Sequence, residues 1–97
     1  MEIQIDSTLY RIEEWSTTNP ETEEGDVLDN YTSLQGRVYG HFMFADGTFM
    51  TTAPLYSVSK EGVALTINGL RYKLGSVDKD FEVVCPNAKE RLIENWS

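Results

Sequence analysis

The sequence predicts a mostly β protein of the α+β class. We expect an antiparallel meander of five to six strands, forming a curved sheet or small barrel, with one short C-terminal helix. Asp46-Gly47 and Asn68-Gly69 each interrupt a segment of apolar residues, and residues 87–96 carry apolar side chains at helical spacing. Asp-Gly and Asn-Gly accept the positive φ angles of the tight turns that join paired strands. Each dipeptide therefore predicts a hairpin with a two-residue loop.

The hairpin at Asn68-Gly69 predicts the clearest register. Side chains alternate between the two faces of a strand, so a one-residue slip would move every apolar group of one strand to the other face. A four-residue loop over 59–62 adds one more strand in front of this hairpin. The expected apolar pairs are Ile67 with Leu70, Leu65 with Tyr72, Val63 with Leu74, Val58 with Val63 and Tyr56 with Leu65, leaving Thr66, Ala64, Arg71 and Lys73 on the other face.

The hairpin at Asp46-Gly47 follows the same rule. One face receives Phe44 opposite Phe49 and Phe42 opposite Thr51, and the other receives Met43 opposite Met50 and His41 opposite Thr52. Together the two hairpins make residues 36–75 the β-meander core. Gly36 and Gly40 in its first strand predict bulges or bends, and Pro54 should lie at a strand end or edge.

The N-terminal third is less regular. Ile3 and Ile5 alternate with polar residues and predict a short strand. Residues 9–15 fit two structures: a strand with Tyr10 and Ile12 on one face and Leu9 and Trp15 on the other, or a helix capped by Ser7. We favour the strand, because its neighbours are strands. Residues 16–30 form an acidic loop that is longer than most connections in compact domains.

The C-terminal segment predicts the helix. Asn87 is a suitable N-cap, and Glu90 three residues later completes a capping box. The apolar stripe of this helix over 87–96 consists of Ala88, Leu92, Ile93 and Trp96. Because so short a helix is marginal alone, it should pack against the sheet.

Length and composition indicate one domain over residues 1–97. The single cysteine, Cys85, excludes an internal disulfide and fits a reducing compartment. The N-terminus lacks a basic segment followed by a hydrophobic one, and no apolar run reaches membrane-spanning length. We therefore expect a cytoplasmic protein that does not bind membranes.

The net charge of −8 comes from 16 acidic and 8 basic residues and is concentrated near the N-terminus. Residues 1–35 hold nine acids and one base, Arg11. Since no basic stripe exists in the sequence, we expect no direct binding to nucleic acid. An acidic surface favours a partner with a basic surface instead. The candidate partner-binding carboxylates are Glu21, Glu23, Glu24, Asp26, Asp29, Asp78, Asp80 and Glu82.

A second candidate surface lies on the sheet face opposite the phenylalanines of the first hairpin. It would consist of Tyr39, His41, Met43 and Met50. If the helix or the N-terminal strand covers this face, these residues are a second layer of core. If the face is open, the mixture of aromatic, Met and His side chains is typical of an interaction surface.

Enzymatic chemistry has little support in the sequence. Cys85 and His41 are the one conventional nucleophile–base pair, with Asp46 available to orient the imidazole, but no accompanying catalytic motif is present. His41 and one cysteine are too few for a structural zinc site. The acidic loop lacks the ligand spacing of a calcium loop. We expect a protein without catalytic activity, metal or cofactor.

The run Gly40-His41-Phe42-Met43-Phe44-Ala45-Asp46-Gly47 and the later Tyr72-Lys73-Leu74-Gly75 resemble small single-domain proteins encoded by phages and mobile elements. This resemblance implies a stand-alone accessory protein that works by binding. The sequence therefore predicts a non-enzymatic inhibitor or modulator of a basic, nucleic-acid-handling protein, with carboxylates that imitate a phosphate backbone. The alternative is a structural subunit that self-associates or joins a larger assembly through a sheet face or edge.

Overall fold

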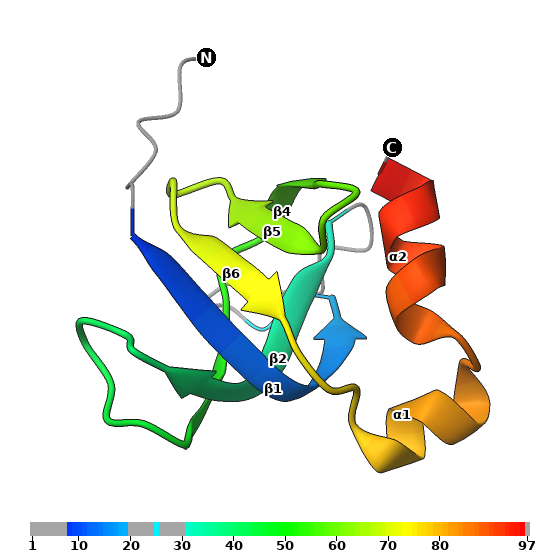
Figure 1. The fold of residues 1–97 in the computed structure, drawn as a ribbon, viewed down its shortest axis with the longest axis horizontal. Coiled ribbons are helices and arrows are strands. Elements are labelled where there is room, and N and C mark those ends of the chain that lie inside the picture. The colour runs from blue at the N-terminus through cyan, green and yellow to red at the C-terminus, as the bar shows by residue number, and fades with distance from the viewer. Residues whose placement is uncertain (1–7, 20–24, 26–30, 97) are drawn as a thin grey trace.

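The computed structural model describes residues 8–19, 25 and 31–96. Within these ranges the chain forms a six-stranded mixed sheet followed by two short helices (Figure 1). The predicted strand around Ile3 and Ile5 lies outside the described residues. The elements are β1 (Leu9–Thr18), β2 (Ser33–Tyr39), β3 (Thr48–Thr51), β4 (Leu55–Val58), β5 (Val63–Thr66), β6 (Arg71–Leu74), α1 (Lys79–Val84) and α2 (Ala88–Trp96).

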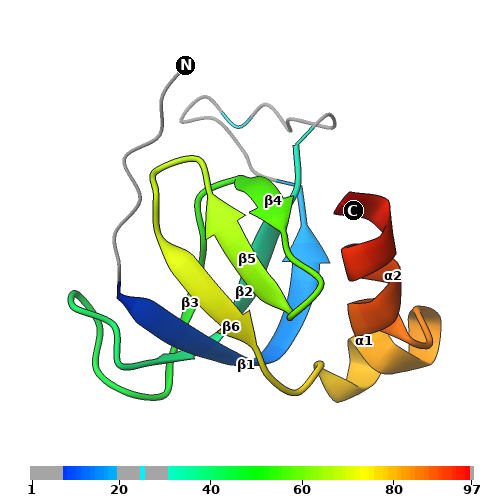
Figure 2. The ribbon, with the colours of Figure 1, turned by 45° about the horizontal axis from the view of Figure 1, so that its top comes forward.

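The mostly β class is confirmed, but the prediction of a purely antiparallel meander is wrong. The strand order is β3-β2-β1-β6-β5-β4, and β1 pairs with β6 in parallel, with Tyr10 opposite Tyr72 and Ile12 opposite Leu74. A parallel pair needs a long connection, and here β2 to β5 supply it. Figure 2 shows the sheet curling around its inner face, and it does not close into a barrel.

The core lies inside this curled sheet and continues under α2. Trp15, Ile12, Leu34, Val38 and Tyr72 are fully or almost fully buried there. The predicted helix over 87–96 is confirmed as α2, whose Ala88 and Leu92 join the core while Trp96 stays partly exposed. The helix packs against β4.

The helix α1 was not expected from the sequence, and it changes the predicted capping box. Asp78 caps α1 by accepting the backbone N–H of Phe81 at 3.1 Å. The backbone N–H of Asn87, at the start of α2, donates to Glu82 in α1 at 3.1 Å. Glu82 therefore takes the role that the sequence predicts for Glu90, because α1 brings the Glu82 carboxylate to the start of α2.

The strand prediction for residues 9–15 is confirmed. β1 continues to Thr18, so residues 16–18 belong to the strand, and the start predicted for the acidic loop over 16–30 is wrong. The predicted faces are also wrong at Trp15. Glu13 lies opposite Arg37 and Ser16 opposite Gln35, so two residues of β1 face Gly36. This is a β-bulge, which Glu14 permits by adopting a φ of 51°. The extra residue turns Trp15 to the same side as Tyr10 and Ile12, where its indole N–H donates to the carbonyl of Gly75 at 3.1 Å. Leu9 is about half exposed on the other face.

Both later hairpins have three-residue loops, so the predicted two- and four-residue loops are wrong. Ser59 pairs with Val63 and Thr66 with Leu70 by backbone hydrogen bonds of 2.9 Å. The Ser59 hydroxyl also accepts the backbone N–H of Val63 at 3.2 Å, and the Thr66 hydroxyl accepts that of Leu70 at the same distance. The third loop residues, Gly62 and Gly69, have φ angles of 82° and 85°. Glycine in the left-handed region at this position is typical of a three-residue hairpin loop.

The three-residue loops shift β5 by one position from its predicted register. Ala64 lies opposite Tyr72, and Leu65 lies opposite Arg71. Consequently Ala64 and Thr66 fill the core side of β5, whereas Val63 and Leu65 are half-buried on the outer side. The predicted core residues of β6, Tyr72 and Leu74, are correct. Pro54 immediately precedes β4, in a trans peptide bond, as expected for a strand end.

Candidate functional site

The hairpin predicted at Asp46-Gly47 is a long loop. β2 ends at Tyr39 and β3 begins at Thr48, so residues 40–47 connect the two strands; we name them the aromatic loop. The predicted pair of Phe44 and Phe49 is wrong, because Phe49 lies opposite Arg37. The chain leaves β2 through Gly40, whose φ is 73°.

Hydrogen bonds at both ends hold the aromatic loop closed. The carboxylate of Asp46 accepts the backbone N–H of Gly40 at 2.8 Å, and the N–H of Gly47 donates to Val38 at 2.8 Å. A turn of Ala45 to Thr48 returns the chain to β3, and the Thr48 hydroxyl also donates to the Ala45 carbonyl at 2.6 Å. The bond between Asp46, near the end of the loop, and Gly40, at its start, therefore closes the loop.

His41 anchors the middle of the loop to the sheet. Its buried ring stacks on Tyr10 with centroids 4.7 Å apart, and Phe42 stacks on it from the loop at 5.0 Å. The ring nitrogen Nδ1 accepts the backbone N–H of Met43 at 3.1 Å, and Nε2 lies 3.2 Å from the Tyr72 hydroxyl. Because Nδ1 accepts, the neutral ring carries its proton on Nε2, which donates to Tyr72.

The anchored loop presents large apolar side chains to solvent. Phe42 and Met43 are 67% and 68% exposed, and Phe44 is 36% exposed. Phe49, on β3 just after the loop, is 57% exposed. Single exposed apolar residues are ordinary, but consecutive aromatic and Met side chains on an internally bonded loop are typical of an interaction surface.

The second surface predicted from the sequence is not one face. Met43 is exposed on the aromatic loop, and His41 is buried beside Tyr10. Tyr39 is half-buried on β2 with the Arg11 guanidinium 4.5 Å above its ring, and Met50 packs against the core from β3. The prediction assumed a strand through residues 41–44, and the loop removes the alternation on which it depended.

The sequence predicts a sheet face for Phe42, Phe44 and Phe49, and this prediction overlooks the exposed surface that they form. A signal was present: Phe42, Met43 and Phe44 are three consecutive large apolar residues next to Gly40. A half-buried strand alternates apolar and polar residues, and this run does not. Consecutive apolar groups beside a loop glycine therefore favour a loop that exposes them.

Comparisons with protein-family models, curated proteins and solved structures find no match. None of the helices in residues 8–19, 25 and 31–96 is long and apolar enough to cross a membrane.

The first acidic cluster lies outside the described residues. Its members are Glu21, Glu23, Glu24, Asp26 and Asp29. The second cluster is described, and two of its carboxylates have local structural roles: Asp78 caps α1 and Glu82 binds the start of α2. Asp80 is exposed in the first turn of α1.

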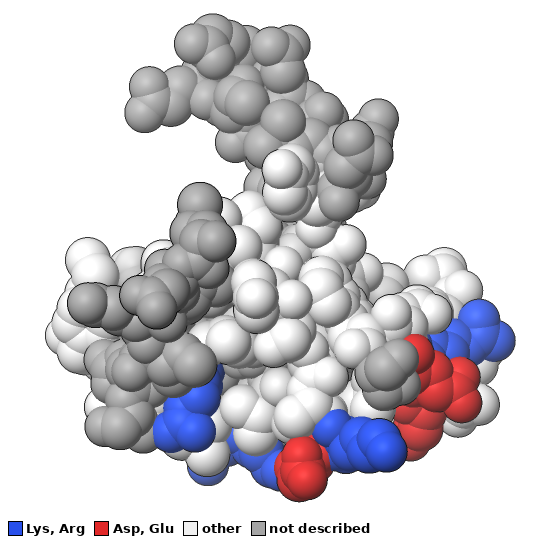
Figure 3. Space-filling view, turned by 90° about the horizontal axis from the view of Figure 1, so that it is seen from above, with Lys and Arg blue, Asp and Glu red and all other residues white. Residues whose placement is uncertain are grey.

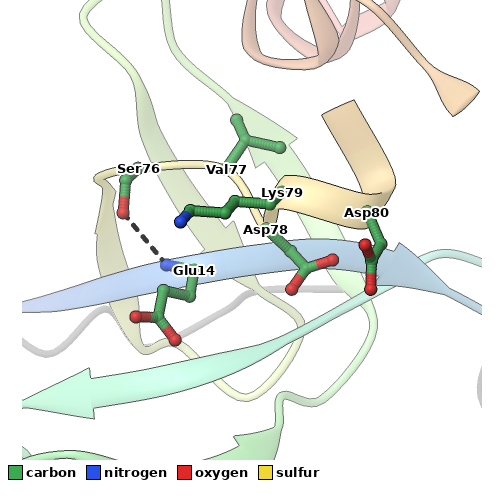
Figure 4. Close-up of a pocket in the computed structure, with 6 residues that line it drawn as sticks. All are labelled: Glu14, Ser76, Val77, Asp78, Lys79 and Asp80. Atoms are coloured by element: carbon green, nitrogen blue, oxygen red, sulfur yellow. Dashed lines mark hydrogen bonds between the residues drawn. The ribbon is translucent and has the colours of Figure 1, made fainter. Parts of the chain in front are cut away.

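Asp78 and Asp80 line a pocket of about 480 Å³ beside the β1 bulge (Figure 4). The other lining residues are Glu14, Ser76, Val77 and Lys79. The backbone N–H of Glu14 donates to the Ser76 hydroxyl at 3.3 Å, which ties β1 to the segment before α1. In the close-up, the carboxylates of Asp78 and Asp80 extend in the same direction from the start of α1.

The described body is close to neutral. Of the 16 acidic residues, two lie in residues 1–7 and five in residues 20–30, ranges that contain no Lys or Arg. The rest of the chain therefore holds nine acids and eight bases. On the face drawn in Figure 3, the visible Lys and Arg side chains lie along one rim, interspersed with Asp and Glu.

His41 and Cys85 have different surroundings. The two ring nitrogens of His41 form hydrogen bonds with Tyr72 and Met43. These partners differ from Cys85 and Asp46, the thiol and carboxylate that the sequence offered for a catalytic arrangement. Cys85 is half-buried after α1, where it packs against the core. Asp46, which the sequence offered to orient the imidazole, binds Gly40 instead.

Proposed function

We propose that the chain is a non-enzymatic interaction protein that docks onto a protein partner through the aromatic loop. The observation that carries this proposal is the exposure of Phe42 and Met43, each about two-thirds accessible, on a loop that His41 fixes to the core. Aromatic and Met side chains are enriched at the centres of protein interfaces. The partner should offer an apolar pocket that receives these two side chains.

The hydrogen bonds within the aromatic loop support a binding role for its exposed apolar side chains. Ordering a loop at an interface costs free energy, and a loop that is already ordered avoids much of this cost. Here Asp46 closes the loop and His41 holds its middle, so Phe42 and Met43 are presented before any partner arrives.

A protein partner fits better than a lipid surface. Exposed Phe and Met residues can also enter the boundary of a bilayer, but stable attachment usually needs a second, electrostatic attraction to anionic lipids. The chain outside residues 1–7 and 20–30 holds nine acids and eight bases, so it offers no net positive charge to attract an anionic membrane. An apolar protein pocket requires no such attraction.

The experiment compares partner capture by the native chain and two paired variants. Phe42→Ser with Met43→Ser removes the apolar loop side chains. Val83→Ser with Val84→Ser is the matched control, because these side chains are each 78% exposed on α1. We expect the native chain and the α1 variant to capture the same protein from cell lysate, and the loop variant to lose it. Capture that survives in the loop variant, or that only the α1 variant loses, would contradict the proposal.

Self-association is a second candidate, favoured by the strand order. β3 and β4 are the two edges of the sheet, and β3 directly follows the aromatic loop. Open edges can pair with another chain, although edges of only four residues offer few hydrogen bonds. Light scattering over a concentration series distinguishes the two: a mass that rises with concentration supports self-association, and a constant monomer mass favours a separate partner.

A further inference from the structure

The two edges of the sheet differ in how well they are protected against a further strand. At β4, Pro54 precedes the strand, and the pairing with β5 shifts between Leu55 and Ser57. The backbone N–H of Leu55 donates to the carbonyl of Thr32 at 2.7 Å, and α2 packs against the strand. Proline, register shifts and covering elements are features by which proteins prevent an edge from pairing with another chain. The β4 edge is therefore protected.

The β3 edge carries none of these features within the residues that the structure describes. Its sequence, Thr48-Phe49-Met50-Thr51, contains no proline and no charged side chain, and it pairs with β2 in one continuous register. Aromatic and β-branched residues of this kind favour a strand. Nothing in its composition opposes the addition of another strand.

The hydrogen-bond pattern shows which backbone groups β3 presents at this edge. In an antiparallel pair, every second residue of a strand directs its backbone N–H and C=O to the neighbouring strand. The Thr52 N–H donates to the Leu34 carbonyl at 2.7 Å, and two residues earlier Met50 lies opposite Gly36 on β2. Phe49 and Thr51 therefore direct their backbone groups away from β2. In the described part of the chain, no hydrogen bond across the edge reaches these groups.

The aromatic loop adjoins the start of this edge. β3 begins at Thr48, directly after Gly47, and the Thr48 hydroxyl donates to the Ala45 carbonyl at 2.6 Å. This bond, together with the one from Gly47 to Val38, fixes the end of the loop relative to β3. An extended segment paired with β3 and continued beyond Thr48 would therefore reach the aromatic loop.

We propose that the edge of β3 binds an extended segment of the protein partner, which adds to the sheet as a further strand beside the aromatic loop. The backbone N–H and C=O groups of Phe49 and Thr51 would pair with the main chain of that segment, a mode of recognition known as strand addition. Because side chains alternate along a strand, the segment should carry apolar residues at every second position, on the side of the exposed Phe49.

This proposal rests on the proposed function for the apolar part of the contact. An edge of four residues offers few hydrogen bonds, so strand addition here needs a second source of affinity. Phe42 and Met43, each about two-thirds exposed on the adjoining loop, provide it. The partner should therefore combine an extended segment with an apolar pocket.

A separate partner fits this edge better than a second copy of the chain. Pairing of β3 with β3 of a second copy would bring two aromatic loops to one interface, and each loop would need an apolar pocket on the other copy. The pocket of about 480 Å³ in the described part of the chain does not meet this need, because Val77 is the one apolar residue among the six that line it.

The first measurement is amide hydrogen exchange of the free full chain, followed residue by residue by NMR. We expect the Met50 amide to exchange slowly, because it faces β2, and the Phe49 and Thr51 amides to exchange fast. Slow exchange at both Phe49 and Thr51 would show that another part of the chain already pairs with this edge, and it would overturn the proposal.

The second measurement uses a displayed library of random peptides of about ten residues, the length of a long strand. Peptides selected on the native chain are labelled and measured by fluorescence anisotropy against two variants. Thr51→Pro removes the outward N–H and leaves the hydrogen bonds between β3 and β2 in place, as proline at an edge position allows. Thr51→Val is the matched control, because it changes the side chain and keeps the N–H.

We expect the selected peptides to carry apolar residues at alternate positions and to bind the native chain and Thr51→Val equally. Binding to Thr51→Pro should be about tenfold weaker, because a peptide carbonyl loses its donor. The peptides should also slow exchange at Phe49 and Thr51 in the native chain, a result that does not depend on the folding of the proline variant.

The proposal would be overturned if no peptide is selected, if the two variants bind equally, or if exchange at Phe49 and Thr51 is unchanged by the peptides. A molecular mass that rises with concentration in the native chain and in Thr51→Val, but not in Thr51→Pro, would also overturn it, because a second copy would then occupy the edge.

The Phe42/Met43 variant separates this proposal from the proposed function. Peptides that bind this variant weakly but bind Thr51→Pro normally would support the aromatic loop and refute strand addition. Peptides that show the opposite pattern would support strand addition and refute the role of the aromatic loop.

Discussion

The backbone N–H of Met43 donates to Nδ1 of His41 at 3.1 Å, and this bond joins the exposed apolar loop to a buried ring. Nδ1 can accept this hydrogen bond only when it carries no proton. Burial lowers the pKa of His41 below its ordinary value of 6.5, because the charged ring would lose hydration. The geometry of the aromatic loop therefore depends on a neutral histidine.

This relationship predicts how stability changes with pH. Since the pKa of His41 is lower in the folded than in the unfolded chain, the unfolded chain binds more protons just below pH 6.5. Stability should be complete above that pH and fall as the pH drops through 6.5 toward the folded pKa. Burial raises the pKa of Tyr72 to about 12, and Ser76 lowers that of Glu13 below 4.5, so neither group titrates in this window.

Urea denaturation between pH 5 and 8 measures this effect. His41 is the single histidine of the sequence, so its resonances in an NMR titration are unambiguous. We expect a His41 pKa below 6.5 and a loss of stability on acidification that His41→Phe reduces, because phenylalanine keeps the ring stacking without a titratable nitrogen. A measured His41 pKa at or above 6.5 would contradict this prediction.

Gly36 makes the bulge in β1 possible and predicts a cost for any larger residue. A Cβ atom at this position would lie 2.8 Å from the Glu13 carbonyl oxygen and 3.0 Å from the Trp15 Cα atom, both backbone atoms. Gly36→Ala should therefore destabilise the fold by about 1–3 kcal/mol. Thr51→Ala on the exposed side of β3 is the control. Equal urea midpoints for the two variants would contradict this prediction, because they would show that the backbone of the bulge can shift to admit a Cβ atom.

The sequence predicted those parts of the fold that depend on local chemistry. The strand over residues 9–15, the helix over 87–96 and the core side of β6 follow from alternation and helical spacing. The parallel contact between β1 and β6 joins Tyr10 to Tyr72, and no local pattern encodes the pairing of segments so far apart. The sequence also did not predict the bulge at Glu14. The bulge follows from the burial of Trp15 in the core, which depends on tertiary packing and not on the local sequence.

The candidate site was harder to predict than the fold, for a physical reason. Gly47 and Gly69 both follow a turn-forming Asp or Asn, but they end connections of different length. At Gly69 the Thr66 hydroxyl contacts Asn68 and closes a short loop, whereas at Gly47 the Asp46 carboxylate binds back to Gly40 and closes a long one. Dipeptide propensity is the same in both cases. The outcome depends on side-chain hydrogen bonds beyond the dipeptide.

The register of β5 can be tested by enlarging one side chain. Ala64 is fully buried opposite Tyr72, so Ala64→Leu should overpack the core and cost about 1–3 kcal/mol of stability. In the register of a two-residue loop the same leucine would lie on the outer face and cost little. Thr51→Leu, at an exposed strand position, controls for the general effect of the substitution. A stability of Ala64→Leu equal to that of the native chain would refute the observed register.

The five carboxylates between residues 21 and 29 lie outside the described residues, and the last prediction, which concerns them, rests on the sequence. Changing Glu21, Glu23, Glu24, Asp26 and Asp29 to Gln or Asn should weaken capture of a basic partner and flatten its salt dependence, because the long-range attraction is lost. Glu61→Gln with Glu90→Gln, two exposed carboxylates of the described body, should leave both unchanged. If neutralising these carboxylates alters neither capture nor salt dependence, the aromatic loop remains the surface to examine. If capture is lost with the acidic residues and retained in the Phe42/Met43 variant, charge rather than apolar contact selects the partner.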